Sequence, residues 1–491
     1  GTLALDKLIC IYDDNGISID GEVDAWFNED VPARFEAYGW RVIRNVDGHD
    51  AEEITKALSN AAKSDGRPTL VCCKTTIGFG SPSKQGTASA HGSVLGREEI
   101  ELTKAALGWA HEGWDIPEDV YQAWNQREAG ALRQHAWQQV LDGYSTAHPQ
   151  QAAEFVRRMR GELPANWQES IQAFAEKEQQ SPANLETRKS SQACISAIAA
   201  GVPELFGGSA DLTGSNNTRW AEATDDQHMS YGVREFGMTA ISNGIQLHGG
   251  YRPFTGTFLI FMEYARNAVR LAALMKVPNI FVYTHDSVAV GEDGPTHQPV
   301  EQITNLRTTP NLHTWRPCDT VESAIAWQSA VASTDSPSAL IFTRQKTVAQ
   351  ARDKATFDNI QWGGYVLRDT DGQPDAIVIA TGSEVELAVA AAESLASSNV
   401  KVRVVSMPCV EVFAAQSAQY KESVLPNAVR ARVAVEAGHP DFWHRFVGLD
   451  GIVVGISSFG MSAPGPQAMA ELGITTENVV QQIRNVIGAT G

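Results

Sequence analysis

The chain has 491 residues, of which 43% are hydrophobic and 20% are charged, and its formal net charge is -19 at pH 7. This length suggests about three domains that each bury a core of their own. Such an acidic chain is not expected to bind nucleic acid or anionic membranes, which repel it, so an anionic substrate would need cations placed locally around it.

The six cysteines show neither the spacing of metal ligands nor a disulfide framework, and most lie in apolar runs; they are Cys10, Cys72, Cys73, Cys194, Cys318 and Cys409. A reducing cytosol is the simplest compartment for such a chain. No apolar run reaches about 18 residues. Residues 1–20 also lack the basic start and apolar core of a signal peptide. We therefore expect a cytoplasmic protein without membrane segments.

Short apolar runs recur along the chain, and most are followed by Gly, Asp or Ser and then by a helical pattern. The runs are KLICIY, TLVCCK, NIFVYT, SALIFT, AIVIAT, KVRVVS, ARVAVE and GIVVGI. They are typical of buried parallel strands in an α/β protein. Residues 117–189 are instead rich in Gln, Glu, Ala and Trp at helical spacing, which predicts a helical connector. The sequence therefore predicts three α/β units with mainly parallel sheets.

Two segments predict particular helices. The run FLIFMEYARNAVRLAALM, residues 258–275, places apolar side chains on one helical face; these are Phe258, Phe261, Met262, Ala265 and Val269. In TGSEVELAVAA, Ser383 and Glu386 have the spacing of a capping box, and the alternative is an anion at the helix start. We expect the unit that contains this second helix to support a dimer and to take no part in catalysis.

Several motifs accompany these elements: DDNGISIDG, GTASAHG, TRKSSQ, GGSADLTGSNNT, YGVREFGM, GEDGPTHQPVE, FTRQ and TGSEVELAVAA. Together they resemble the motifs of the transketolase family over nearly the whole chain. The resemblance implies a thiamine-diphosphate-binding fold with three domains. Residues 1–150 would be the remainder of a diphosphate-binding domain with a connector to about residue 186, residues 187–348 the pyrimidine-binding domain, and residues 362–491 the C-terminal domain. Because the family has a further segment upstream, we expect the first domain to lack its N-terminal part.

The resemblance also implies residues that bind thiamine diphosphate. Glu235 of REFGM would bond the aminopyrimidine ring and assist its activation, Phe261 would stack on it, and Phe258 and Tyr264 would lie near it. His91 of SAHG would be close to the cofactor as well. Without the family likeness, Glu235 would be interpreted as part of a surface charge pair and the aromatic residues as core.

Magnesium would bridge the diphosphate to hard oxygen ligands. The side-chain oxygen of Asn15 and the backbone carbonyl of Ile17 match two ligands of the family, and Ca²⁺ or another divalent ion can take the place of Mg²⁺. Considered alone, the Asn-Gly pair in DDNGISIDG predicts an ordinary turn. The family's third protein ligand, an Asp in an upstream Gly-Asp-Gly, has no counterpart here.

Residues for a sugar phosphate come from motifs that are far apart in the sequence. By resemblance, the phosphate would be held by Arg188, Ser215, His285 and Arg344, and arginine forms the strongest charge-assisted bonds to phosphate. Nearer the reacting carbons, Asp293 would bond a sugar hydroxyl. His91 and His297 would bond hydroxyls and relay protons, tasks that suit histidine near neutral pH.

The implied activity is a transketolase reaction in homodimers whose active sites lie between subunits. A two-carbon glycolaldehyde unit would move from a ketose phosphate, such as xylulose 5-phosphate or fructose 6-phosphate, to an aldose phosphate such as ribose 5-phosphate. Dihydroxyacetone synthase is an alternative that differs mainly in its acceptor, whereas QPVE after GEDGPTH disfavours deoxyxylulose-phosphate synthase. A third alternative is a non-catalytic fragment that dimerises. No nucleic-acid or membrane partner is expected.

Overall fold

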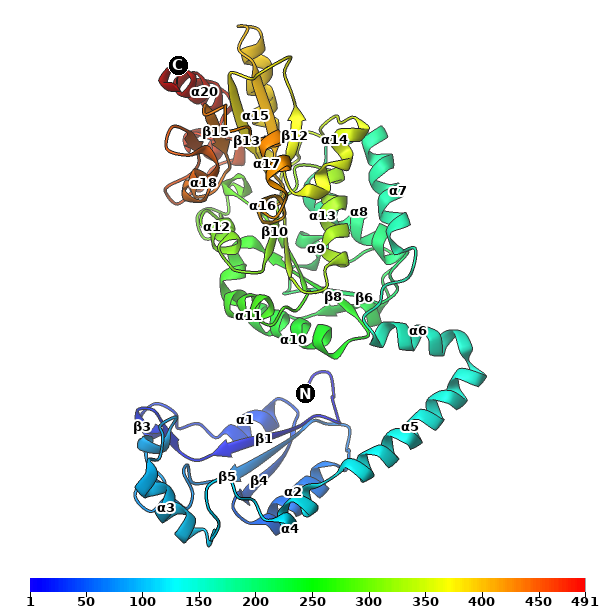
Figure 1. Cartoon of the computed structure of the whole chain (residues 1–491), viewed down its shortest axis with the longest axis vertical. Coiled ribbons are helices and arrows are strands. Elements are labelled where there is room, and N and C mark those ends of the chain that lie inside the picture. The colour runs from blue at the N-terminus through cyan, green and yellow to red at the C-terminus, as the bar shows by residue number, and fades with distance from the viewer. Residues whose placement is uncertain (491) are drawn as a thin grey trace. The chain divides into compact units, whose positions relative to one another are not determined.

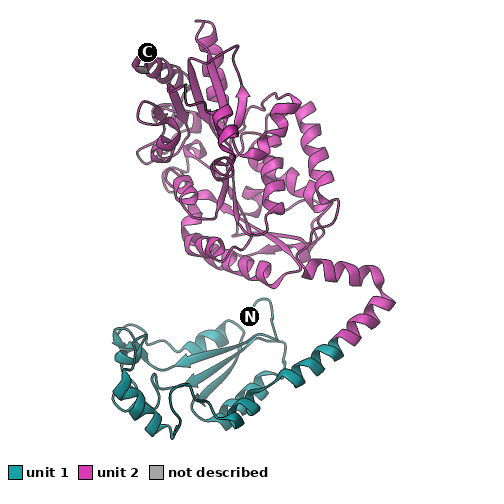
Figure 2. Ribbon diagram, viewed as in Figure 1, with its two compact units in different colours: residues 1–137 teal, residues 138–491 magenta. Residues whose placement is uncertain are grey.

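The computed structural model of the chain describes residues 1–490. These form two compact units, residues 1–137 and residues 138–491, and each is described by itself (Figure 2). The predicted class is confirmed, because the chain contains three α/β arrangements whose sheets are mainly parallel. One of these arrangements lies in the first unit and two lie in the second.

The first unit is built on a parallel sheet with the strand order β1-β5-β4 (Figure 1). Its strands are β1 (Ile9–Asp14), β4 (Arg41–Asp47) and β5 (Thr69–Lys74), with a small hairpin of β2 (Ile17–Ser18) and β3 (Gly21–Glu22). Its helices are α1 (Val31–Ala37), α2 (Ala51–Ala61), α3 (Arg97–Ala106) and α4 (Glu118–Trp124). The runs KLICIY and TLVCCK form β1 and β5 as predicted. The central strand β5 is buried on both faces.

The predicted connector is helical. It consists of α4, α5 (Arg127–Ala147), α6 (Pro149–Met159) and α7 (Trp167–Gln180). The division between the two compact units falls within α5. Most residues of this long helix are exposed, and none of them is buried.

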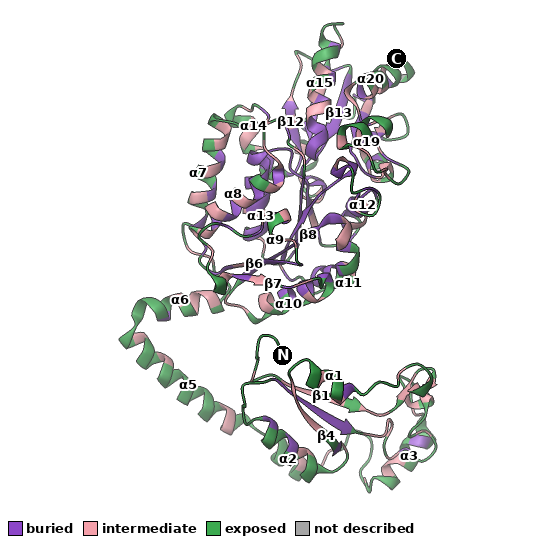
Figure 3. Cartoon of the chain, turned by 180° about the vertical axis from the view of Figure 1, so that it is seen from behind, coloured by how far each residue is buried: buried purple, intermediate pink, exposed green. Residues whose placement is uncertain are grey.

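The first sheet of the second unit has six strands in the order β10-β11-β9-β8-β6-β7, all of them parallel. The strands are β6 (Leu205–Ser209), β7 (His228–Ser230), β8 (Arg252–Phe258), β9 (Ile280–Thr284), β10 (His313–Trp315) and β11 (Ser338–Phe342). The helices are α8 (Thr187–Ala199), α9 (Thr213–Asn216), α10 (Glu235–His248), α11 (Met262–Leu274), α12 (Gln302–Arg307) and α13 (Thr320–Ala332). Its central strands are fully buried (Figure 3).

The second sheet of this unit has the order β12-β14-β13-β15-β16, in which only β12 runs antiparallel. The strands are β12 (Tyr365–Arg368), β13 (Ala376–Ala380), β14 (Val402–Ser406), β15 (Arg432–Val435) and β16 (Ile452–Val454). The helices are α14 (Lys354–Asp358), α15 (Val385–Ala396), α16 (Val410–Ala414), α17 (Ala418–Val424), α18 (His444–Val447), α19 (Gly465–Glu471) and α20 (Thr476–Thr490). The last four predicted apolar runs form β13 to β16.

Two local predictions were wrong. Phe258 is the last residue of β8 and Phe261 lies in a 3-10 turn, so the helical face begins only at Met262. Ser383 and Glu386 form no capping box, because Glu384 precedes α15 at the N-cap position. The Glu386 carboxylate instead accepts a hydrogen bond from the backbone N–H of Val348, at 3.0 Å.

All six cysteine thiols are free. Five of them are buried. Within residues 1–490, no helix is both long enough and apolar enough to cross a membrane.

Candidate functional site

Five rings that the sequence analysis selected form one cluster in the second unit. Phe258 ends β8, and its ring stacks on Phe261 with centroids 5.6 Å apart and on His285 with centroids 3.7 Å apart. The Phe261 ring lies 5.4 Å from that of His297 and 6.0 Å from that of Tyr264. The strand end, the turn after it and the first turn of α11 therefore present flat aromatic faces beside two imidazoles.

Glu235 is a buried carboxylate at the first position of α10, and it is 9% exposed. This helix packs against β8 and α11, the elements that carry the aromatic cluster. Within residues 1–490, no hydrogen bond or ion pair reaches the Glu235 side chain. Its oxygens are not among the side-chain atoms that are buried without a partner in residues 1–490, so they are open to a ligand that brings a donor of its own.

Two arginines from different elements lie near each other at the same site. Arg188, in α8, donates from Nη1 to the carbonyl of Ser215 at 2.9 Å, and Arg344, after β11, donates from Nη1 to the carbonyl of Val290 at 3.1 Å. Burial lowers the pKa of Arg188, and the charge of Arg344 lowers it further. In the described chain, neither guanidinium forms an ion pair, and Arg188 Nε is buried without a partner. Two such cations fit an anionic ligand.

His285 stands between the arginines and the aromatic rings. It follows β9 with φ of +62° and is 4% exposed. Burial, followed by the charges of Arg188 and Arg344 and by His297, lowers the pKa of this imidazole to about 3. His285 is therefore neutral at pH 7. Its Nδ1 lies 2.9 Å from Oγ1 of Thr284.

The loop after β9 carries the remaining predicted residues of this unit. Asp293 is exposed and His297 is partly buried. Two successive turns shape the loop, in which the N–H of Gly294 donates to the carbonyl of Gly291 and the N–H of His297 donates to the carbonyl of Gly294, both at 3.0 Å. The neighbouring Gln298, which we had not selected, is buried.

The other three predicted residues belong to the first unit. Asn15 follows β1, and its side-chain oxygen accepts a hydrogen bond from the N–H of Ile17 at 2.9 Å. This geometry is that of the predicted turn. His91 follows the 3-10 turn Ala88–Ala90 in the loop after β5. In the described part of the chain, no group of three or more His, Cys, Asp or Glu side chains has the arrangement of a metal site.

The loop that carries His91 is held by residues that the motifs did not indicate. Glu99 of α3 accepts hydrogen bonds from the hydroxyl of Ser81, and from the N–H and hydroxyl of Ser83 at 2.9 and 2.5 Å. Lys84 donates to the carbonyl of Leu95 at 2.8 Å. A glutamate in the first turn of a predicted helix is too common to indicate a functional role, so the sequence alone did not identify Glu99.

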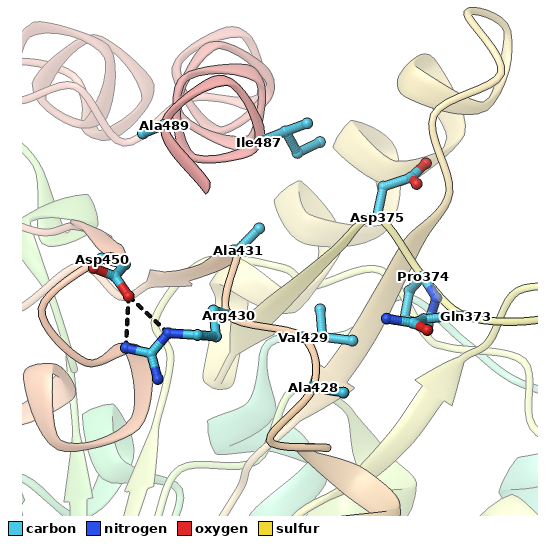
Figure 4. Close-up of a pocket in the computed structure, with 10 residues that line it drawn as sticks. All are labelled: Gln373, Pro374, Asp375, Ala428, Val429, Arg430, Ala431, Asp450, Ile487 and Ala489. Atoms are coloured by element: carbon cyan, nitrogen blue, oxygen red, sulfur yellow. Dashed lines mark hydrogen bonds and ion pairs between the residues drawn. The ribbon is translucent and has the colours of Figure 1, made fainter. Parts of the chain in front are cut away.

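A cavity of about 630 Å³ lies elsewhere, beside the amino ends of β13 and β15 and near the end of α20 (Figure 4). Arg430 and Asp450 in its wall form an ion pair at 2.5 Å, and both are exposed. None of the residues that the sequence analysis selected lines this cavity. It therefore has no part in the site described above.

The chain matches three families along its length. Residues 1–164 match "Transketolase, thiamine diphosphate binding domain", residues 183–349 match "Transketolase, pyrimidine binding domain", and residues 363–475 match "Transketolase-like TK C-terminal domain". The cofactor expectation is thereby confirmed at the level of a thiamine-diphosphate-binding domain.

Individual relatives agree over nearly the whole chain. Transketolase 1 of Vibrio vulnificus strain YJ016 is 56% identical over 99% of this chain and 74% of its own length, and transketolase 2 of Aliivibrio fischeri is 55% identical over the same shares. Solved structures include transketolase from Leishmania mexicana, with a TM-score of 0.92 and 41% identity over 99% of this chain and 72% of its own. The Pichia stipitis enzyme in complex with sedoheptulose 7-phosphate has a TM-score of 0.93 and 37% identity over 99% of this chain and 73% of its own. The chain belongs to the transketolase family.

Proposed function

We propose that this protein transfers a two-carbon ketol unit from a ketose phosphate, such as xylulose 5-phosphate or fructose 6-phosphate, to an aldose phosphate such as ribose 5-phosphate. The observation that carries this proposal is the pair of guanidiniums of Arg188 and Arg344, which have no carboxylate partner in the described chain and lie beside stacked aromatic rings. Bidentate bonds from arginine suit phosphate. Ser215 and His285 complete the proposed phosphate site.

The remaining polar residues act nearer the reacting carbons. Asp293 accepts a hydrogen bond from a sugar hydroxyl, which makes it a determinant of stereochemistry. His297, with its ring against Phe261, and His91 accept protons from substrate hydroxyls and return them. Imidazoles are suited to both directions of transfer near neutral pH.

Thiamine diphosphate, when bound, supplies the carbanion-stabilising chemistry that the protein side chains lack. Glu235 would meet its aminopyrimidine ring, since this largely buried residue has carboxylate oxygens that reach the surface and no hydrogen-bond partner among the described residues. Phe261 would stack on the ring, with Phe258 and Tyr264 beside it, and such offset contacts are worth about 1 kcal/mol beyond burial. His91 would lie close to the cofactor.

Mg²⁺ is the proposed metal, and Ca²⁺ or another divalent ion can take its place. The side-chain oxygen of Asn15 and the carbonyl of Ile17 are hard donors, as this ion prefers. Removal of divalent ions by a chelator should abolish the activity, and added Mg²⁺ should restore it. Activity that survives chelation would contradict the metal assignment.

We also propose that the protein is a homodimer. Helices α10 and α11 pack side by side, and each leaves an apolar stripe exposed. The stripes contain Phe236, Ala240, Gly244 and Leu247 on α10, and Tyr264, Leu271 and Leu274 on α11. Apolar surfaces of this kind on neighbouring helices mark protein interfaces. The absence of a side chain at Gly244 would let a second copy approach closely.

Sedimentation tests the dimer. Leu247→Asp should convert a dimer into a monomer, because a carboxylate in an apolar contact is uncompensated. Leu449, in the loop before β16, is fully exposed, so Leu449→Asp is the matched control and should leave the mass unchanged. A wild-type protein of monomer mass would contradict the proposal.

The reaction is tested by initial rates with thiamine diphosphate, Mg²⁺, xylulose 5-phosphate and ribose 5-phosphate. Arg188→Ala should raise the KM for the phosphorylated donor at least about tenfold, because a charge-assisted bond is lost. It should leave the KM for unphosphorylated xylulose nearly unchanged. An equal effect on both donors would contradict the phosphate site.

Two further measurements separate the alternatives. Clear preference for formaldehyde over ribose 5-phosphate as acceptor would favour a dihydroxyacetone synthase. Calorimetric titration with thiamine diphosphate and Mg²⁺, using Glu235→Ala as the control, tests the third alternative. Absence of binding by the wild-type chain would favour the non-catalytic fragment.

A further inference from the structure

The side chain of Gln298 joins the substrate loop to a segment of the C-terminal domain. Its Nε2 donates to the carbonyls of Gly291 at 2.8 Å and Met461 at 2.9 Å, and it lies 3.2 Å from that of Val288. Gln298 is 2% exposed. Because all three neighbours are acceptors, only a donor satisfies this position. The amide therefore holds together two turns from different domains of the second unit.

The C-terminal segment that Gln298 reaches is residues 460–465, here called the clamp segment. Ser462 donates from its hydroxyl to the carbonyl of Glu292 at 2.7 Å. The clamp segment lies so close to the substrate loop that a residue larger than glycine would clash at position 465. A Cβ added at Gly465 would lie 2.5 Å from the carbonyl oxygen of Ala289. A Cβ at Gly460 would lie 1.9 Å from Oε1 of Gln298. Backbone therefore lies directly against backbone at Gly465, and the backbone of Gly460 lies directly against the side chain of Gln298.

The turn under the clamp segment serves both ends of the proposed substrate site. It is the 3-10 turn Val288–Val290, and the carbonyl of Val290 accepts the hydrogen bond from Arg344 at 3.1 Å. The loop that continues from the turn carries Asp293 and His297. A displacement of the turn would thus move a phosphate-binding cation and two residues near the reacting carbons together.

We propose that Gln298 and Ser462 are positioning residues, through which the clamp segment of the C-terminal domain sets the geometry of the substrate loop, residues 288–298. This inference rests on the proposed function, because it assigns Arg344, Asp293 and His297 to substrate. It differs from our expectation that the C-terminal domain takes no part in catalysis. Loops held by few hydrogen bonds are the parts of a protein that open most easily, so loss of these contacts should loosen the loop before the fold.

Hydrogen exchange followed by mass spectrometry tests the contact independently of any activity. Ser462→Ala should raise the exchange of the amides in residues 289–297 by about tenfold, and Gln298→Met should raise it further, because the carbonyls of Gly291 and Met461 lose their donor. Ser462→Thr keeps the hydroxyl and should restore protection. Ser458→Ala is the matched control, since Ser458 is exposed on the same stretch of chain. Exchange that is unchanged in Ser462→Ala and Gln298→Met would overturn the proposal.

Kinetics with xylulose 5-phosphate then test the positioning role. Ser462→Ala and Gln298→Met should each raise the donor KM at least about threefold, with a smaller change in kcat. Their thermal unfolding temperatures should lie within about 2 °C of wild type. A loosened loop with an unchanged donor KM would overturn the role in substrate positioning. An inactive wild-type protein would contradict the proposed function instead, and the exchange result would then decide the contact alone.

Discussion

At the scale of single residues, the hydrogen bonds around His285 fix its tautomer. The Thr284 hydroxyl lies 2.7 Å from Oδ1 of Asn216, and Nδ2 of Asn216 lies 3.3 Å from the hydroxyl of Ser209. The shorter distance suits a bond between two oxygens. Thr284 therefore donates to Asn216 and accepts from Nδ1–H of His285. The neutral ring keeps its lone pair on Nε2, which can accept a hydrogen bond and cannot donate one.

This tautomer predicts that phosphate binding takes up a proton. A phosphate dianion cannot accept a hydrogen bond from a nitrogen that carries only a lone pair. The pKa of His285 is lowered first by burial and next by the charges of Arg188 and Arg344, and a bound dianion offsets these two charges. The pKa therefore rises when the ligand binds. Titration with xylulose 5-phosphate in buffers of different ionisation enthalpy should show this uptake. The donor KM should rise with pH.

Two variants check the assignment. His285→Asn should abolish the proton uptake. Thr284→Val frees the ring to carry its proton on Nε2 and should reduce the uptake, whereas Thr284→Ser should preserve it. A binding heat that is independent of buffer in the wild-type protein would contradict the prediction.

The lowered pKa of His285 also affects stability. The unfolded chain, with an ordinary pKa of about 6.5, binds more protons than the folded chain below that pH. The folded state should therefore lose stability as pH falls from about 6.5 towards 3, with a slope of at most about 1.4 kcal/mol per pH unit from this group. Denaturant unfolding of wild type and His285→Asn at several pH values would measure the difference.

The members of the candidate site were proposed from sequence because each lies in a motif that resembles one of the family, and some of these motifs, such as those of Phe258, His285 and Arg344, are at strand ends. Thr284 and Asn216 were not selected, since a threonine beside a histidine has no distinctive spacing. The contact with Asn216 joins the end of β9 to helix α9. Gln298 was inside the quoted GEDGPTHQP motif, but its partner Met461 lies in another domain, as does Ser462, which bonds to the carbonyl of Glu292. Contacts between distant segments require the three-dimensional structure.

At the scale of elements, α3 holds the loop that carries His91. The hydrogen bonds from Ser81 and Ser83 lower the pKa of Glu99 to about 2. This carboxylate is therefore ionised at neutral pH. Its stabilising effect should be complete above about pH 4.5 and lost as pH falls towards 2. The helix thus fixes the loop through one charged acceptor.

Glu99→Gln should loosen this loop. The amide keeps one acceptor oxygen but turns an NH₂ group towards donors, so part of the network is lost. We expect a several-fold higher donor KM and faster hydrogen exchange in residues 81–95. Glu98→Gln is the matched control, because Glu98 is exposed next to it. A donor KM in Glu99→Gln equal to that of the control would contradict this role.

The strands that the sequence predicted are those with continuous apolar runs. Strand β6, LFGGS, was missed because glycine is unfavourable in strands. Its glycines are required by packing, since a Cβ at Gly207 would lie 2.1 Å from the ring of Phe254, and one at Gly208 would lie 2.6 Å from the ring of Tyr231. Strand β4 was missed because charged residues interrupt it and its register shifts between Ile43 and Val46. Tertiary packing overrides local propensity in both strands.

At the scale of the whole molecule, a buried ionic cluster joins the two sheets of the second unit. Arg316, after β10, bonds to Asp286 after β9 at 2.7 Å, to Glu384 before α15, and to the carbonyl of Thr381 at 3.0 Å. Arg307 of α12 bonds to Glu436 after β15 at 2.7 and 2.9 Å. Three carboxylates thus share two guanidiniums, and all these side chains are at most 2% exposed.

Arg316→Met should therefore separate the unfolding of the two sheets. This substitution removes the cation that Asp286 beside the first sheet shares with Glu384 and Glu436 beside the second. Breaking a buried ion pair costs about 3–5 kcal/mol. In scanning calorimetry, a transition at lower temperature should separate from the main one. Arg430→Met is the control, because the exposed pair of Arg430 with Asp450 should contribute less than about 1 kcal/mol. If Arg316→Met unfolds at the wild-type temperature in the wild-type number of transitions, the cluster does not couple the domains. The clamp segment and the apolar contacts would then account for their association.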